Sequence, residues 1–422
     1  MSGEYMKRII DDYFEGRMKS SGAVLIEGAK SCGKTRTAKE HAASALYMQD
    51  PDLRENHLKM AKVKPSELLK GETPRLIDEW QIAPILWDAV RFEVDKRSGA
   101  VGQFILTGST SVPEDKIMHS GAGRISRMLM RPMSLFESMD SDGSVSLREL
   151  FERKNDVSGV SEMSLEEICF FIVRGGWPES IGKEERYAMN RVQDYVNAIA
   201  YADASAVDGV RRNPKLVLAI LGSLSRNIST TAAMTTIRAD VSNTEEGMNE
   251  KTMASYINAL RKLFVIEDVP AWNPAVRSRS AQRASPKRHF VDPSIAASMF
   301  HLSSKGLMKD LNTLGFLFES LCVRDMRVYS QAIDGEIYHY RDRTDLETDM
   351  IIHLRDGRWA AAEVKLGHDQ IDDAARNLLR IREKVDTDKM QMPSFLMVIT
   401  SSGYAYERED GVLVVPIGCL KD

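Results

Sequence analysis

Short runs of apolar residues alternate with amphipathic stretches over the first 110 residues of the chain. Three runs, at 23–27, 75–81 and 103–109, are predicted to be buried strands because their apolar residues are consecutive and the runs are short. Residues 6–17 and 84–97 instead place apolar side chains at helical spacing, which predicts two amphipathic helices. Strands that alternate with helices indicate an α/β fold with a largely parallel sheet.

The pattern changes near residue 141. Two loop-like stretches, 140–146 and 154–164, precede a predominantly helical region at 164–225. Residues 252–264 again show helical spacing, and the alternating segment 265–272 that follows predicts a strand. Helices followed by a strand in this way resemble a winged-helix unit.

The last third of the chain predicts a second α/β unit with its own core. A helix is expected from about Thr313 to Tyr329, and a later helix at 372–385. Strands are expected around them, at 336–341, 349–355, 358–366, 395–400 and 412–418.

Composition narrows the class of protein. The chain has 422 residues, 43% of them hydrophobic and 28% charged, and its four cysteines lack metal-site spacing, which is typical of a cytoplasmic globular protein. No run is long enough for a membrane span or a signal peptide. The net charge is −4, so any contact with nucleic acid must come from a local patch. One stretch, 275–288, carries basic residues and no acid; it is either a solvated connector or a phosphate-contacting loop.

The strand at 23–27 runs into the pattern Gly28-x-x-x-x-Gly33-Lys34-Thr35, and the alanine-rich segment 35–47 after it is predicted to be helical. Strand, glycine-rich loop and helix are the context of a P-loop. Lys34 is expected on the β- and γ-phosphates and Thr35 on Mg²⁺. The predicted nucleotide-binding residues are Gly28, Ala29, Lys30, Ser31, Cys32, Gly33, Lys34, Thr35 and Arg36.

Hydrolysis is predicted from the residues that end the next two strands. Asp78, expected on a strand beside the P-loop, would hold Mg²⁺, and Glu79 would act as general base on the attacking water. Thr107, in the segment 106–110, could hold that water; the alternative is a strand-ending turn. An isolated Asp-Glu pair is common and usually lies on a solvated face, so its apolar strand is what supports this prediction.

Three arginines follow the third strand and could reach the γ-phosphate as an arginine finger. Arg124 is the candidate, acting in cis or from a neighbouring subunit, and Arg127 and Arg131 are the alternatives.

These segments occur in a recognisable order: LIEGAKSCGKT, RLIDEWQIAPILWDAVR, FILTGST and GR…RPMSLFE, followed by GGWPES, YINALRKLFVIEDVPAW and PKRHFVDPSIA. In this order they resemble a family of prokaryotic AAA-type ATPases whose C-terminal part is a domain of unknown function of the 4143 type. The resemblance implies ATP as the nucleotide. It also implies an AAA-like core (1–140), a helical lid (141–225), a winged helix (226–275), a basic linker (276–288) and a C-terminal domain (289–422). Cys32 departs from the usual loop sequence.

A second group of charged residues lies in the C-terminal domain. Asp349 opens one strand, and Glu363 and Lys365 lie two residues apart in the next, so their side chains share a face. With Glu319 on the preceding helix, they resemble the PD-(D/E)xK nuclease fold over about 100 residues. Asp349 and Glu363 would bind Mg²⁺ and Glu319 would support it through water, while Lys365 would assist catalysis and Gln370 would orient the site. The alternative is a salt-bridged cluster without catalysis.

Three functions follow from these predictions. In the first, ATP hydrolysis is coupled to a DNA-associated nuclease-like domain, with DNA bound by the winged helix, residues 277–288 and the C-terminal domain. In the second, the chain is an ATP-dependent regulatory switch that binds a protein partner through a catalytically silent C-terminal domain. A kinase or transferase ranks third because no acceptor site is evident. AAA relatives often form rings, so a homo-oligomer is one possible state of this chain. No membrane contact is expected.

Overall fold

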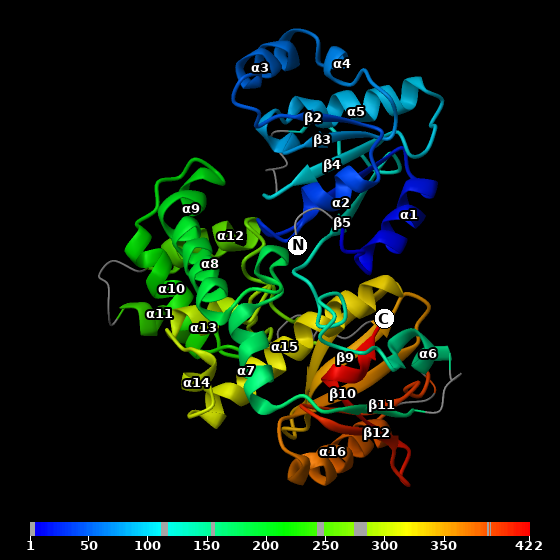
Figure 1. Ribbon diagram of the computed structural model, residues 1–422, viewed down its shortest axis with the longest axis vertical. Coiled ribbons are helices and arrows are strands. Elements are labelled where there is room, and N and C mark those ends of the chain that lie inside the picture. The colour runs from blue at the N-terminus through cyan, green and yellow to red at the C-terminus, as the bar shows by residue number, and fades with distance from the viewer. Residues whose placement is uncertain are drawn as a thin grey trace. The chain divides into compact units, whose positions relative to one another are not determined.

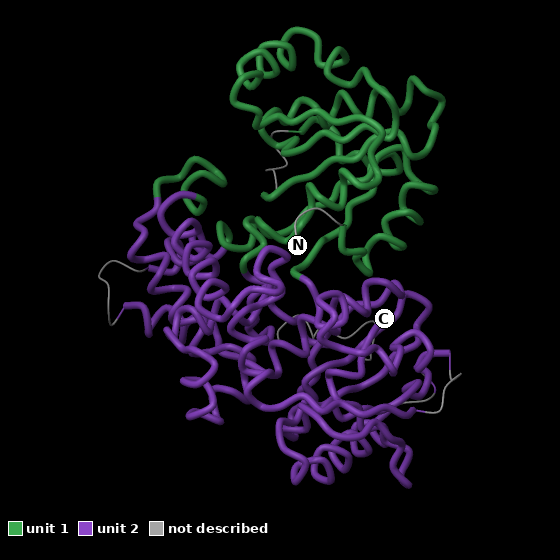
Figure 2. Tube along the Cα trace, in the orientation of Figure 1, with its two compact units in different colours: residues 1–132, 203–211, 258–265 green, residues 133–202, 212–257, 266–422 purple. Residues whose placement is uncertain are grey.

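The computed structural model describes residues 5–110, 117–152, 157–242, 249–273, 285–385, 388 and 390–422. The chain divides into two compact units (Figure 2). Unit 1 contains residues 1–132, 203–211 and 258–265, and unit 2 contains residues 133–202, 212–257 and 266–422.

Unit 1 is built on a five-stranded sheet in the order β2-β3-β4-β1-β5, in which each pair of neighbours is parallel (Figure 1). The α/β prediction is therefore confirmed. The strands are β1 (Ala23–Glu27), β2 (Ser44–Tyr47), β3 (Arg75–Asp78), β4 (Phe104–Gly108) and β5 (Ile125–Leu129). The helices are α1 (Ile10–Ser20), α2 (Lys34–Glu40), α3 (Arg54–Val63), α4 (Pro65–Leu68), α5 (Ile85–Lys96) and α9 (Ala204–Ala206).

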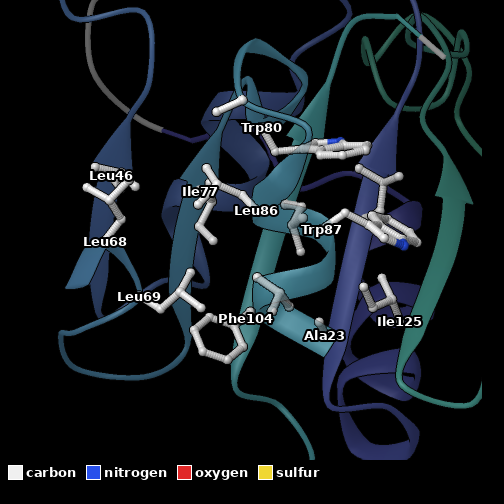
Figure 3. Packing of buried hydrophobic residues seen from close by; sticks show 14 of the residues in the cluster. Ala23, Leu46, Leu68, Leu69, Ile77, Trp80, Leu86, Trp87, Phe104 and Ile125 are labelled. Carbon is white, nitrogen blue, oxygen red and sulfur yellow. The ribbon is translucent and has the colours of Figure 1, made fainter. Parts of the chain in front are cut away.

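Alternating side chains of these strands build two apolar cores, one on each face of the sheet. Ala23 and Leu25 of β1 pack with Trp87 of α5 and with residues of α3 and α4 (Figure 3). Val24 and Ile26, the intervening residues of β1, pack with apolar residues of α1 and α2. Helices thus cover both faces of the sheet, so polar functional side chains are expected at the ends of the strands.

Two expectations for unit 1 need correction. The predicted helix 35–47 ends at Glu40, and Ser44–Tyr47 forms β2 instead, because this segment pairs with β3 and buries Leu46. Tertiary pairing therefore overrides the helix propensity of the alanines. The strand that carries Asp78 is also not next to the P-loop strand, because β4 lies between β3 and β1.

Unit 2 contains a seven-stranded mixed sheet in the order β7-β12-β13-β11-β10-β9-β8 and a two-stranded sheet, β14-β6. Its strands are β6 (Val145–Ser146), β7 (Gly159–Ser161), β8 (Gly335–Arg341), β9 (Glu347–Leu354), β10 (Trp359–Lys365), β11 (Leu396–Thr400), β12 (Gly403–Glu407), β13 (Val412–Pro416) and β14 (Leu420–Lys421). The short strands β6 and β7 fall in stretches that were expected to be loops of the helical lid 141–225. Pairing with C-terminal strands, which local sequence cannot reveal, makes them part of this unit.

The helices of unit 2 are α6 (Leu147–Glu152), α7 (Leu165–Arg174), α8 (Glu185–Ala198), α10 (Pro214–Arg226), α11 (Met234–Ser242), α13 (Ser294–Met299), α14 (Ser304–Leu307), α15 (Leu311–Ala332) and α16 (Ile371–Glu383). Helix α12 (Glu250–Lys262) begins in unit 2 and ends in unit 1. The apolar side of α16 packs on the sheet against Trp359 and Val398. Helix α15 contacts β8, β9 and β10, which brings a helix predicted to carry an acidic residue next to the strands that carry the others.

Candidate active site

The loop after β1 has the backbone that a P-loop requires. Gly28 has φ 152° and Gly33 has φ 108°, and Ser31 between them has φ 62°. A Cβ atom at Gly28 would lie 2.1 Å from the carbonyl oxygen of Met130, so no other residue fits there. Local sequence and the close approach of the chain after β5 together fix the loop.

Lys34 opens α2 and is buried, with 5% of its surface exposed. Its ammonium donates hydrogen bonds to the carbonyl oxygens of Gly28, at 2.9 Å, and Ala29, at 2.7 Å. Neutral carbonyl groups therefore hold the positive charge of Lys34 at the loop. In a P-loop the lysine reaches the phosphates from this position.

Asp78 is fully buried at the end of β3, and three neutral side chains hold its carboxylate. The hydroxyls of Thr35 and Thr107 donate to Oδ1 at 2.7 and 2.6 Å, and the amide of Gln49 donates to Oδ2 at 2.5 Å. Strand β4 carries Thr107 between β3 and β1, which explains how it reaches Asp78. Sequence analysis placed Thr35, Asp78 and Thr107 in the site but missed Gln49, whose position follows from the unpredicted strand β2.

Glu79 follows Asp78 in a left-handed conformation, with φ 56°, and is half-buried. Its backbone N–H donates to the hydroxyl of Thr107 at 3.1 Å. Its carboxylate accepts hydrogen bonds from Ser109, at 2.9 Å, and from the amide of Gln81. A positive φ is uncommon for a non-glycine residue. One donor to the Glu79 carboxylate, Ser109, lies in the predicted segment 106–110, whereas sequence analysis missed the other, Gln81.

The predicted arginine finger lies at the other edge of the sheet. The backbone of Arg124 accepts a hydrogen bond from Ala23, the first residue of β1, and its guanidinium binds Asp95 at 2.8 Å. Because β5 runs parallel to β1, Arg124 is at the amino edge and the P-loop is at the carboxyl edge. Arg124 therefore does not reach the P-loop of its own chain.

The two competing arginines lie within β5 and just after it. Arg127 is within β5, with its guanidinium 4.7 Å from the ring centre of Trp87. Arg131 lies just past the carboxyl end of β5, and its carbonyl oxygen accepts a hydrogen bond from Arg8 at 2.9 Å. Arg8 also donates to the carbonyl oxygen of Cys32 at 3.0 Å, so a residue outside every predicted motif supports the P-loop.

The remaining predicted loop residues differ in their surroundings. Lys30 forms an ion pair with Asp203 at 2.5 Å, and Arg36 lies 5.8 Å from the ring centre of Tyr5 and pairs with Glu40. Cys32 is fully buried, and its thiol donates to the carbonyl oxygen of Met130. Cys32 therefore contributes to packing under the loop.

The side chains around the loop fit Mg²⁺. Thr35 and Asp78 present a hydroxyl and a carboxylate side by side, the hard oxygen donors that Mg²⁺ takes together with nucleotide phosphates and water. Lys34 beside them supplies the charge for the phosphates.

The acidic residues of the C-terminal domain are held differently. The ammonium of Lys287 lies 2.5 Å from a Glu319 oxygen and 2.8 Å from a carboxylate oxygen of Asp349. Lys365 pairs with Glu363 at 3.1 Å, which agrees with the expectation that both side chains share a face. A lysine thus lies between Glu319 and Asp349, whereas the metal was expected on Asp349 and Glu363, with Glu319 supporting it through water.

Hydrogen bonds complete this arrangement. The other oxygen of Asp349 accepts the backbone N–H of Val364 at 2.8 Å, and Asn377 of α16 donates to Glu363 at 3.2 Å. Gln370, in the 3₁₀ turn His368–Gln370, is exposed. Within the described part of the chain, no group of three or more His, Cys, Asp or Glu side chains is placed to hold a metal ion. As they stand, Glu319, Asp349 and Glu363 do not fit a divalent cation.

Burial and neighbouring charges shift the pKa values of the residues in this cluster. Burial raises the pKa of Glu319 to about 8, and the neighbouring Asp349 charge acts in the same direction. Burial and the Asp349 charge also raise the pKa of Glu363. Burial alone would lower the pKa of Lys287, but Asp349 and Glu319 hold it above its ordinary value. Lys287 is therefore a permanent cation in this pocket.

Most of the predicted basic loop, residues 277–284, lies outside the described residues. Its last two basic residues are turned inward: Lys287 joins the acidic cluster, and Arg288, 4% exposed, pairs with Asp268 at 2.9 Å. For these two residues the expectation of a phosphate-contacting surface is corrected, because each finds an internal carboxylate.

Comparisons with known proteins agree with the P-loop site. Residues 20–139 match the family model of an AAA domain, and residues 314–420 match a domain of unknown function, DUF4143. Residues 165–306 between them match a further domain of unknown function, DUF8612. The chain therefore contains an AAA domain and a DUF4143 domain, as the resemblance implied. The AAA domain supports ATP binding, and the likeness to the PD-(D/E)xK fold stays a prediction.

Solved structures give weaker likenesses. The Walker-type ATPase PABY2304 of Pyrococcus abyssi is 13% identical with a TM-score of 0.42, covering 69% of this chain and 94% of that chain. The structure of Drosophila ORC bound to DNA is 10% identical with a TM-score of 0.23, covering 66% of this chain and 89% of that chain. At these TM-scores neither likeness carries an argument. A comparison with curated proteins returned no match. Within the described residues, no helix is long and apolar enough to cross a membrane.

Proposed function

We propose that the chain binds ATP with Mg²⁺ and hydrolyses it. The observation that carries this proposal is the contact of Thr35 with Asp78 beside the P-loop, with Glu79 oriented next to it. Thr35 and Asp78 would hold Mg²⁺, which would supply charge stabilisation for the phosphates. Lys34 binds the β- and γ-phosphates, and Glu79 accepts the proton of the attacking water.

The hydrogen bonds around Glu79 support its role as the base. Ser109 and Gln81 hold the carboxylate from one side, and Thr107 links the backbone of Glu79 to Asp78. The proton acceptor and the Mg²⁺-binding carboxylate are therefore fixed with respect to each other, which is what positions a water for attack.

Replacement of the base tests this proposal. Glu79→Gln should lower the rate of ATP hydrolysis by about 10²–10⁴-fold and leave ATP binding unchanged, because the amide cannot accept the proton. Glu55→Gln, in the first turn of α3, is the matched control and should hydrolyse ATP normally. Both are measured by phosphate release and by titration with a fluorescent ATP analogue. Unchanged hydrolysis in Glu79→Gln would exclude Glu79 as the base.

For Arg124 we propose action on the nucleotide of a neighbouring subunit, because it lies at the sheet edge away from its own P-loop. Mixing Arg124→Ala subunits, which keep an intact P-loop, with Lys34→Ala subunits, which keep the arginine, should restore ATPase activity that each variant lacks alone. A mixture as inactive as its components would remove Arg124 from the mechanism.

For the C-terminal domain we propose a binding role without cleavage, the regulatory alternative of the two outputs. The observation that favours it is the pairing of the candidate metal-binding acids with Lys287 and Lys365. In nuclease assays with Mg²⁺, the wild type and Asp349→Ala should show the same DNA cleavage, because the wild-type site does not cut. Cleavage by the wild type that is lost in this variant would restore the nuclease hypothesis.

The class of partner is decided by a binding measurement on the full chain. Salt-dependent affinity for duplex DNA that changes between ATP and ADP would assign the domain to DNA, since counterion release makes such binding fall with salt. DNA binding that is absent in both nucleotide states would assign it to a protein partner.

A further inference from the structure

The ammonium of Lys287 lies between two carboxylates in unit 2. Its nitrogen is within 2.8 Å of one oxygen from Glu319 of α15 and one from Asp349 of β9. The three side chains are 13%, 12% and 16% exposed, respectively. Because one nitrogen reaches both oxygens, the point it occupies is also where a single metal ion would bridge them.

The backbone fixes Lys287 in this place. Its N–H donates to the carbonyl oxygen of Val269 at 2.9 Å, and the N–H of Val269 donates back to Lys287 at 2.9 Å. This antiparallel bridge belongs to unit 2 and orders the residue independently of its side chain. The ammonium is therefore tethered next to the acids, whereas a cation from solution loses its translational freedom on binding.

The remaining groups of the cluster complete the charge balance. Lys365 pairs with Glu363, and Val364 donates its N–H to the oxygen of Asp349 that Lys287 does not contact. Two lysines thus face three carboxylates, one of which, Glu319, has its pKa raised by burial. A divalent ion with oxygen ligands would have to displace an ammonium that is hydrogen-bonded to Asp349 and ion-paired with Glu319.

We propose that Lys287 is the resident cation of this acidic pocket and that it excludes a divalent metal ion from Glu319 and Asp349. The proposal deepens the binding role assigned to the C-terminal domain and rests on it. Loss of the ammonium would leave two carboxylates around an unoccupied cation position, which a divalent ion could then fill.

Binding of Mn²⁺, followed by electron paramagnetic resonance on the nucleotide-free full chain, tests the proposal. Wild type and Asp349→Asn should bind the same amount of Mn²⁺. Lys287→Met should bind about one more Mn²⁺ per chain, because the two carboxylates are then free for a metal. This gain should disappear in Lys287→Met/Asp349→Asn. Lys287→Arg, which keeps the positive charge, should show no gain.

Lys384→Met is the matched control, because Lys384 also pairs with an aspartate, Asp342, at 2.5 Å, but on the exposed surface. It should bind as much Mn²⁺ as the wild type. Folded Lys287→Met without the gain would overturn the proposal. If that variant does not fold, the wild type decides: Mn²⁺ bound to it and lost in Asp349→Asn overturns the proposal, and equal binding supports it. Mn²⁺ on the wild type without DNA cleavage would refute the resident cation and leave the binding role standing.

Discussion

The two candidate sites each place a buried carboxylate near a lysine, but they satisfy the carboxylate in different ways. Within the described residues, the hydrogen bonds to Asp78 come from the uncharged side chains of Thr35, Thr107 and Gln49. Lys34 nearby is held by two carbonyl oxygens. In the C-terminal domain, Asp349 is instead paired directly with the ammonium of Lys287.

In the first site the charges of the carboxylate and the lysine are available to a ligand, and in the second they neutralise each other. A carboxylate oriented by neutral donors keeps its full charge for an incoming cation, and a lysine held by carbonyl groups keeps its charge for phosphate. Where ammonium and carboxylate meet each other, the charges compensate internally and are not available to a ligand. In the C-terminal domain, Lys287 is the internal cation that meets two of the acids expected at a metal site.

The largest expected effect concerns folding. Lys287→Met should destabilise unit 2 by about 3–5 kcal/mol, because it leaves buried carboxylates without their cation. Hydrogen exchange of β9 and β10 in the folded protein would measure the loss. Lys34→Met should destabilise unit 1 by only about 1–2 kcal/mol, because it removes two hydrogen bonds to carbonyl groups and leaves no unpaired charge. Equal destabilisation by the two variants would break the distinction between the sites.

Activity should show the opposite order. Lys34→Met should lower ATP hydrolysis by about 10²–10³-fold, since a buried donor aimed at developing charge is lost. Lys287→Met should hydrolyse ATP at the wild-type rate wherever it remains folded. Steady-state phosphate release at saturating ATP measures both, and a large loss of activity in folded Lys287→Met would contradict the assignment.

A smaller effect is expected at the residues that orient Glu79. Ser109→Ala removes one hydrogen bond to its carboxylate, worth about 1 kcal/mol, so kcat should fall roughly 5-fold while ATP affinity stays constant. The exposed Ser20→Ala at the end of α1 is the control. An unchanged kcat in Ser109→Ala would mean that Gln81 alone orients the base.

The smallest effect should come from an ion pair behind the P-loop helix. The hydrogen bond from His41 to Asp11, at 3.1 Å, raises the pKa of His41. A raised pKa means that this stabilisation is full below the unfolded value of about 6.5 and is lost as the pH rises through the folded value. Unit 1 should therefore lose up to about 1 kcal/mol as the pH rises above about 6.5.

Thermal unfolding across this pH range measures the slope. His41→Phe keeps a ring beside Phe14, whose centre lies 4.8 Å from that of His41, and should flatten the pH dependence. An identical slope in this variant would assign the pH dependence to other groups.

Much of the P-loop site could be predicted because its signals are local. The glycine spacing, the apolar strand before it and the acids that end β3 all lie within short segments, and Thr35, Asp78 and Thr107 do meet. Gln49 was missed because alanine content suggested a helix where pairing with β3 makes a strand. Arg124 was chosen because it follows the third strand in the segment GAGRISR, which says nothing about the end of the sheet at which it lies.

The C-terminal cluster shows the same limit more clearly. Sequence identified Glu319, Asp349, Glu363 and Lys365, and the structure brings Glu363 and Lys365 together as expected from strand geometry. It could not identify Lys287, which is 62 residues from Asp349 and lay in a stretch that looked like a solvated linker. No local pattern records which carboxylate a lysine will meet.

By itself, then, the sequence determined the AAA domain, most strands and helices of the two α/β units and the residue types that can carry phosphate and metal chemistry, because these depend on periodicity and short motifs. The tertiary structure alone decided the strand order, the neutral donors around Asp78 and the cation beside Asp349. Those features depend on contacts between residues far apart in the chain, where packing and charge compensation choose the partners.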